Sequence, residues 1–159
     1  MTTGQPDEHH DEQQELLALR RARMRKELAD LEYHRQLLRA VSQTSHDQVA
    51  EELRLAPESL AAELKKAHYT PIPKQGYTSA GPYEVCQRYA AGELNREELM
   101  AQLIAWPYVP MGEDMFTSPG DDLIVLPAGT IDELYRAARR GLIDVDVCEA
   151  VFDAVYGRG

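Results

Sequence analysis

Residues 44–66 of the chain have the sequence TSHDQVAEELRLAPESLAAELKK, and this stretch decides how the surrounding chain folds. Ser45 is followed three positions later by Gln48, the spacing of a capping box, which predicts a helix over 45–53. Pro57 suits the first turn of a second helix over 57–67, because a backbone N–H is not needed there. Residues 54–56 are left as the turn between two short helices.

The segment before these two helices has the composition of one long helix. Residues 15–41 contain no Gly or Pro and are rich in Leu, Ala, Arg and Glu, which favour helix. Apolar residues recur there every seven positions, a repeat typical of coiled coils: Leu17, Met24, Leu31 and Leu38. We expect either a coiled-coil homodimer through this stripe or packing of the stripe on the chain's own following helices.

The C-terminal half contains an internal repeat of two copies that predicts two helical hairpins. In each copy a glycine that ends one helix is followed, three positions later, by a polar residue that caps the next. These residues are Gly92 and Asn95 in the first copy, and Gly141 and Asp144 in the second. The predicted helices cover 83–91 and the residues after Asn95, then 131–140 and the residues from Asp144 to about Tyr156.

The predicted fold is therefore mainly α and has four segments. Residues 1–14 carry four carboxylates and no Lys or Arg, so we expect a disordered acidic tail. Residues 15–68 form the long amphipathic helix and the two short helices, and residues 69–82 form a linker rich in Pro and Gly. Residues 83–159 form an acidic helical domain whose two hairpins are joined by a Pro-rich loop.

That loop, over 106–129, carries large side chains in or beside it. Trp106, Tyr108 and Phe116 are the aromatic members. Long loops in compact domains are usually functional. We expect these side chains either to cover the core of the hairpins or to form a partner-binding patch.

Charge is distributed unevenly along the chain. The formal net charge is −10, which by itself argues against nucleic acid as a partner. Residues 15–68, however, hold ten basic and nine acidic residues, whereas residues 69–159 hold seven basic and fourteen acidic ones. Five of the basic residues lie within 20–26. Any affinity for DNA is therefore expected in the first half, and the acidic half is suited to a protein partner.

Catalysis is not expected, because the motifs that build common active sites are missing. The sequence contains no GxxxxGK[ST], GxGxxG, HExxH or GxSxG. The two cysteines, Cys86 and Cys148, have no metal-binding or disulfide spacing and are predicted to be buried thiols. We therefore expect no catalytic residue, no cofactor and no metal. With no signal peptide or apolar span in the sequence, a cytoplasmic protein that does not enter membranes is expected.

Residues 44–66 resemble the helix-turn-helix of small bacterial, actinobacterial-type DNA-binding proteins. Ala50 matches the small residue that lets the two helices cross closely. Apolar residues match the positions that hold the crossing: Val49, Leu53, Leu55, Leu60 and Leu64. Arg54 stands where the family usually has Gly. Residues 83–92 and 106–108 are also similar to a region of such proteins, a similarity that implies no activity.

The resemblance implies a transcriptional regulator that binds double-stranded DNA, with the helix over 57–67 in the major groove. Contacts with DNA are expected from residues in and before this helix: Ser45, Arg54, Glu58, Ser59, Ala61, Lys65 and Lys66. The basic run of the long helix adds Arg21 and Arg25 as phosphate contacts.

No Arg, Asn or Gln stands at the front of the second helix to bind a base edge bidentately. The alternative function is therefore a non-enzymatic interaction module, antitoxin-like or an adaptor. In that case the helix-turn-helix is degenerate and the acidic C-terminal half binds a protein.

Overall fold

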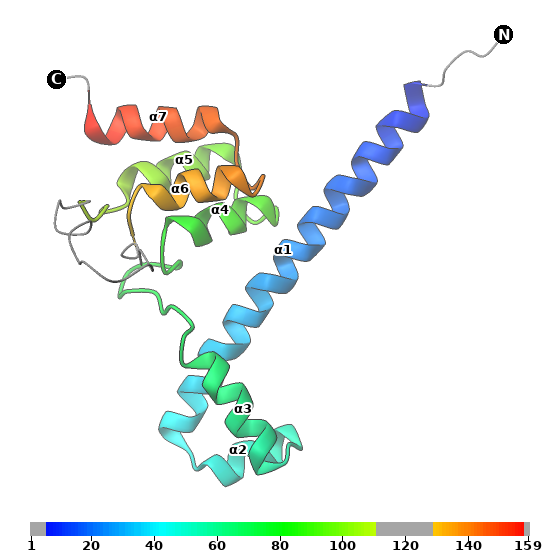
Figure 1. Ribbon diagram of the computed structural model, residues 1–159, viewed down its shortest axis with the longest axis vertical. Coiled ribbons are helices and arrows are strands. Elements are labelled where there is room, and N and C mark those ends of the chain that lie inside the picture. The colour runs from blue at the N-terminus through cyan, green and yellow to red at the C-terminus, as the bar shows by residue number, and fades with distance from the viewer. Residues whose placement is uncertain (1–5, 111–128, 158–159) are drawn as a thin grey trace, which may run out of the picture.

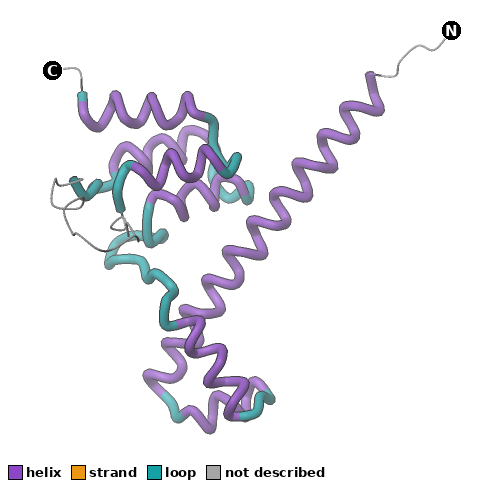
Figure 2. Tube along the Cα trace, viewed as in Figure 1, coloured by secondary structure: helices purple, strands orange, loops and turns teal. Residues whose placement is uncertain are grey.

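The computed structural model describes residues 6–110 and 129–157, and within these ranges the chain is helix or loop with no strand (Figures 1 and 2). The helices, in chain order, are α1 (Pro6–Gln43), α2 (His46–Leu53), α3 (Pro57–Ala67), α4 (Pro82–Ala90), α5 (Arg96–Ala105), α6 (Asp132–Arg139) and α7 (Val145–Tyr156). Figure 1 shows α1 as a long rod, with α2 and α3 at its C-terminal end and the other four helices beside its middle. The mainly α prediction is confirmed. No helix of the described residues is long and apolar enough to cross a bilayer.

The long helix begins earlier than predicted. It starts at Pro6, so the predicted disordered tail is wrong for residues 6–14, while residues 1–5 lie outside the described part. Proline is well suited to the first position of a helix, and carboxylates such as Glu8 favour the positive end of the helix dipole. The acidic composition that predicts disorder here supports the start of a helix.

The two short helices form where the sequence predicts them and pack against the last turns of α1. Ser45 and Gln48 make the predicted capping box, and Pro57 opens α3. Leu37 from α1 joins a small buried core with four residues of the pair: Val49, Ala50, Leu60 and Ala67. This three-helix unit is held by few side chains, so each of them matters to its stability.

The turn between α2 and α3 contains the backbone strain that the sequence implies. Arg54 has φ 55° and ψ 43°, the left-handed conformation that costs a residue with a Cβ more than it costs glycine. It is the only described non-glycine residue with positive φ. The turn closes through a hydrogen bond from Leu55 N–H to Ala50 C=O, a Schellman-type end.

Both hairpins of the C-terminal domain turn in the same way. Gly92 and Gly141 have φ of 85° and 75°. The bonds that close the turns, from Glu93 N–H to Arg88 C=O and from Leu142 N–H to Ala137 C=O, lie at equivalent places in the two copies. Asn95 makes the predicted capping box, whereas the side chain of Asp144 makes no capping bond.

The two hairpins pack on each other into one four-helix domain. α4 contacts both α5 and α6, and α7 contacts α5 and α6. The shared core includes fully buried side chains from all four helices: Val85, Cys86, Leu99, Leu103, Leu134, Val147, Cys148 and Val151. Burial raises the pKa of the Cys86 thiol to about 12. Both cysteines are free, buried thiols, as predicted.

The seven-residue apolar stripe of α1 is mostly used within the chain. Met24 packs against the C-terminal core and Leu38 against the core of the three-helix unit. Leu31 is half-buried, and Leu17 is 46% exposed. The C-terminal part of the stripe, from Met24 to Leu38, therefore packs within the chain, which is the second of the two expected alternatives. The coiled-coil homodimer stays a prediction.

The strained turn yields a stability prediction. In Arg54→Gly, relief of the left-handed strain, about 1–2 kcal/mol, outweighs the extra backbone entropy of an unfolded glycine, about 0.5–1 kcal/mol. We expect the variant to unfold at a higher temperature than the wild type, measured by thermal circular dichroism. Arg54→Ala is the matched control, because it removes the guanidinium but keeps Cβ. Equal gains in both variants would show that the side-chain charge, and not φ, limits stability.

Candidate nucleic-acid interface

The outer face of α3 is the surface that the resemblance assigns to DNA. Leu60 is 3% and Ala67 0% exposed, and they hold the inner face of the helix against α1 and α2. The side chains predicted to contact DNA from α3 are all exposed: Glu58, Ser59, Ala61, Lys65 and Lys66. In Figure 1, α3 lies at the end of the molecule away from α5 and α7. The structure thus brings these five residues together on one accessible helix.

Ser45 and Arg54 lie at the two ends of α2. The Ser45 hydroxyl oxygen accepts the Gln48 N–H at 3.1 Å, and Gln48 Oε1 accepts the Ser45 N–H at 3.3 Å. This oxygen is therefore committed to the helix cap, which leaves the hydroxyl proton as the group that Ser45 can offer to a phosphate. The Arg54 side chain is exposed at the turn.

A polar contact fixes α3 on α1. The Tyr33 hydroxyl donates to Glu63 Oε2 across the two helices. This bond, together with burial and the charge of Glu63, raises the pKa of Tyr33 to about 12. The contact turns one carboxylate of α3 toward α1 and away from the outer face.

Arg21 and Arg25 do not lie with the other predicted DNA contacts. Arg25 stands twelve residues before Leu37 on a straight helix, about 18 Å along the axis at 1.5 Å per residue. Its Nε donates to the Ala91 carbonyl at 3.2 Å, and Arg21 lies against Gly92. The two arginines therefore face the C-terminal domain and lie apart from α3, and their contact with phosphates stays a prediction.

Arg20 and Arg21 help to line a cleft of about 810 Å³ between α1 and the C-terminal domain. A Cβ placed on Gly141 would lie 3.1 Å from Arg20 Nη2, and one on Gly92 would lie 3.6 Å from Arg21 Nε. Guanidinium groups thus lie over the C-terminal ends of α6 and α4, where the helix dipole favours positive charge. The basic run of α1 is explained, at least in part, by docking of the domain.

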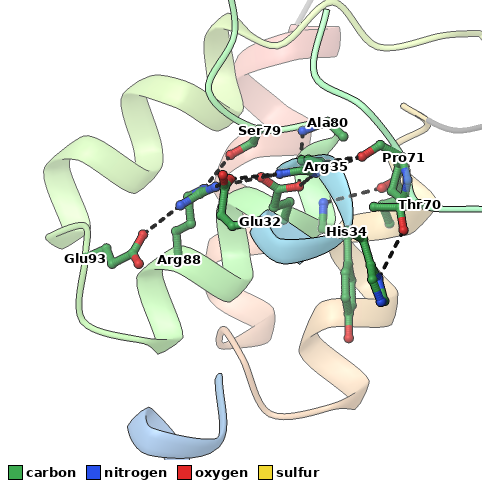
Figure 3. Close-up of polar contacts among 12 residues, drawn as sticks. Glu32, His34, Arg35, Thr70, Pro71, Ser79, Ala80, Arg88 and Glu93 are labelled. Carbon is green, nitrogen blue, oxygen red and sulfur yellow. Dashed lines mark hydrogen bonds and ion pairs between the residues drawn. The ribbon is translucent and has the colours of Figure 1, made fainter. Parts of the chain in front are cut away.

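A buried ion pair joins α1 to α4 and to the linker (Figure 3). Arg35 is 5% and Glu84 4% exposed. Arg35 Nη2 donates to Glu84 Oε1, and Nη1 donates to Oε2 at 3.3 Å. Arg35 Nε and Nη2 also donate to the Pro71 carbonyl at 3.0 and 2.8 Å. One guanidinium therefore holds three segments that are distant in sequence.

A second arginine extends this network toward the surface. Arg88 donates to Glu84 Oε2 at 3.0 Å and to Glu93 Oε2 at 2.9 Å, and Glu32 accepts from Arg35 at 3.3 Å. Burial alone would raise the pKa of Glu84. The bonds and charges of Arg35 and Arg88, with the Ala80 N–H, outweigh burial and hold that pKa below its usual value.

Two aromatic residues of the proposed partner patch, Trp106 and Tyr108, cover the core of the hairpins. Trp106 is half-buried, and its ring centroid lies 5.0 Å from that of Tyr77. The Tyr108 hydroxyl donates to the Leu103 carbonyl at 2.6 Å, and burial raises its pKa. Both side chains pack against the C-terminal core. Phe116 lies outside the described residues.

Sequence reasoning missed Arg35 and Glu84 as a structural centre. The available signal was a basic residue on the apolar side of α1, between Leu31 and Leu38, in a helix with many better places for an arginine. Nothing in the sequence named Glu84 as its partner. Among the described residues, no three His, Cys, Asp or Glu side chains are grouped so that they could hold a metal ion.

Comparisons of the chain with protein-family models, with curated proteins and with solved structures found no match. Function is therefore inferred from the residues and their geometry.

The buried pair yields a prediction on stability and its pH dependence. Arg35→Met leaves the Glu84 carboxylate without its main partner and should lower the free energy of unfolding by about 3 kcal/mol. Because the pKa of Glu84 is lower in the folded chain, the pair stabilises the fold above the unfolded pKa, about 4.3. That contribution is lost as the pH falls through the folded pKa. The difference between wild type and variant, measured by urea unfolding, should therefore shrink in acid.

A double variant separates the pair from general damage to the core. Arg35→Met/Glu84→Met removes both charges, so it should cost less than the two single changes added together. Strict additivity, or a wild-type to variant difference that is constant with pH, would contradict a specific interaction between the two groups.

Proposed function

We propose that the protein is a DNA-binding regulator that places α3 in the major groove of a duplex. The observation that carries the proposal is the division of α3 into two faces. Leu60 and Ala67 are buried in the three-helix unit, while the other face is exposed along the length of the helix and ends in two lysines. This is the arrangement that a helix needs in order to enter a groove while its own unit stays folded.

The proposed roles follow from chemistry and position. Lys65 and Lys66, in the last turn of α3, are suited to phosphates, which position a protein without distinguishing sequences. Ser59 and Ala61 lie nearer the front, where a hydroxyl and a methyl group can contact base edges. Glu58 can accept from the N4 amino group of cytosine. Arg21 and Arg25 are left out of this interface because they face the C-terminal domain.

A second function, that of a protein-interaction module, is favoured by one observation. Residues 37–68, which include the three-helix unit, hold five carboxylates and four Lys or Arg residues. Phosphate binding is driven by positive charge, and this unit has no excess of it. Under this second candidate, the acidic C-terminal domain binds a basic partner and α3 has no duplex to contact.

The lysines distinguish the two candidates through the salt dependence of binding. Lys65→Ala/Lys66→Ala should weaken binding to all duplexes alike. It should also reduce the slope of log affinity against log salt by up to about two, since each lost phosphate contact removes about 0.9. Fluorescence anisotropy with a labelled mixed-sequence duplex, titrated at several salt concentrations, measures both quantities.

Arg96→Ala/Arg139→Ala is the matched control, because it removes two exposed positive charges from the C-terminal domain. It should leave the slope unchanged. If the folded wild-type protein binds no duplex at low salt, the DNA-binding function is excluded and the protein-interaction function is favoured. Equal slopes in the wild type and the lysine variant would remove α3 from the interface.

A further inference from the structure

The first half of α1 is exposed along its length, and its inner side approaches the C-terminal domain through Arg20 and Arg21. Every described side chain from Glu8 to Arg23 is exposed, and Leu16 and Leu19 are 62% and 65% exposed. Most helical stability in proteins comes from tertiary packing of an apolar face. Leu16 and Leu19 have no such packing within the described chain, so their side of the helix is available to a partner.

The exposed leucines belong to a face of α1 that the chain does not use for its own packing. At about 100° per residue, Leu19 lies opposite Leu28, which is 3% exposed and faces inward. The outward face has a spacing of four, three, four and three residues, the heptad pattern of a coiled coil. Its members are all exposed: Glu12, Leu16, Leu19, Arg23 and Lys26. This seam differs from the stripe of Leu17, Met24, Leu31 and Leu38.

The seam is complementary to itself in one orientation only. Its order along the helix is acidic, apolar, apolar, basic, basic. If two copies run antiparallel about a two-fold axis midway between Leu16 and Leu19, Leu16 faces Leu19 of the other copy and Glu12 faces Arg23. In a parallel pair Glu12 would face Glu12 and Arg23 would face Arg23, which is repulsive.

We propose that the outward face of residues 8–26 of α1 binds the same segment of a second copy of this chain as an antiparallel coiled coil. The existing contacts of the charged groups are weak competitors. His9 lies 3.6 Å from Glu12 and Arg23 lies 4.0 Å from Glu27, and both pairs are exposed. Exposed pairs of this kind contribute little to stability, so they exchange readily for contacts between copies.

The pairing sets how far apart two α3 helices would be. About 25 residues separate the two-fold axis from the end of α1, so the two three-helix units lie on the order of 75 Å apart along the pair. Successive major grooves on one face of a duplex are about 34 Å apart. The two α3 helices would therefore contact separate duplex segments. The pairing itself does not depend on DNA binding.

Charge reversal tests the proposal on the full-length protein. Sedimentation velocity from about 5 to about 500 µM should show a monomer–dimer equilibrium of the wild type, as mass action requires, and salt should weaken the dimer. Glu12→Arg or Arg23→Glu alone should raise the dimer Kd by about tenfold or more. The two-fold axis repeats the contact between positions 12 and 23, so each change creates two pairs of like charges in the dimer. Glu12→Arg/Arg23→Glu should restore it.

Asp11→Arg is the matched control, since it reverses a neighbouring acidic residue about 100° around the helix and should change the Kd much less. Circular dichroism checks that each variant keeps its helix content. A wild type that stays monomeric throughout, or a double variant that is no better than the single ones, overturns the proposal. Neither result affects duplex binding by α3, which the lysine variant tests separately.

Spin labels report the orientation directly. Because Cys86 and Cys148 are buried, an introduced exposed cysteine is labelled selectively. Labels on Ala22→Cys should be separated by about 13 Å along the axis of the dimer, and labels on Ala29→Cys by about 35 Å. Equal distances at the two positions would show a parallel pair and overturn the proposal.

Discussion

The buried ion pair between Arg35 and Glu84 is the constraint on which the arrangement of the molecule depends. Moving two charges out of water costs several kcal/mol each, and that cost is offset only when geometry and additional hydrogen bonds are good. Here the guanidinium also binds the Pro71 carbonyl, and Arg88 supplies the carboxylate with a second cation. This placement of α1, α4 and the linker satisfies all of these groups together, and the pair thereby holds the C-terminal domain in position relative to the three-helix unit.

Once that placement is set, α1 divides into three segments with different surroundings. Its last turns complete the core of the three-helix unit through Leu37, and its middle packs on α4 through Met24 and Arg35. The remaining N-terminal segment is exposed and projects beyond the other helices (Figure 1), and within it Arg20 and Arg21 approach the C-terminal domain. The same division explains why the basic run, which looks suited to DNA in sequence, lies instead over the ends of α4 and α6.

Local features of the fold were predictable because they depend on neighbouring residues. The capping boxes at Ser45 and Asn95, the proline that opens α3 and the glycines that end α4 and α6 each act within a few positions. The start of α1 was missed for a related reason. Carboxylates in a polar stretch are compatible with both disorder and a helix N-terminus, and composition does not separate the two.

The sequence by itself determined the helices, their turns and the two faces of α3, since spacing and capping are local and the apolar period shows which side is buried. Only the tertiary structure decided the partner of Arg35, the separation of Arg21 from α3 and the use of Trp106 in covering the core. Each of these depends on which distant segments meet. The sequence around an arginine on an apolar stripe does not show whether its side chain faces solvent, a phosphate or a buried carboxylate. The free-energy cost of removing its charge from water is offset only when the fold brings a carboxylate next to it.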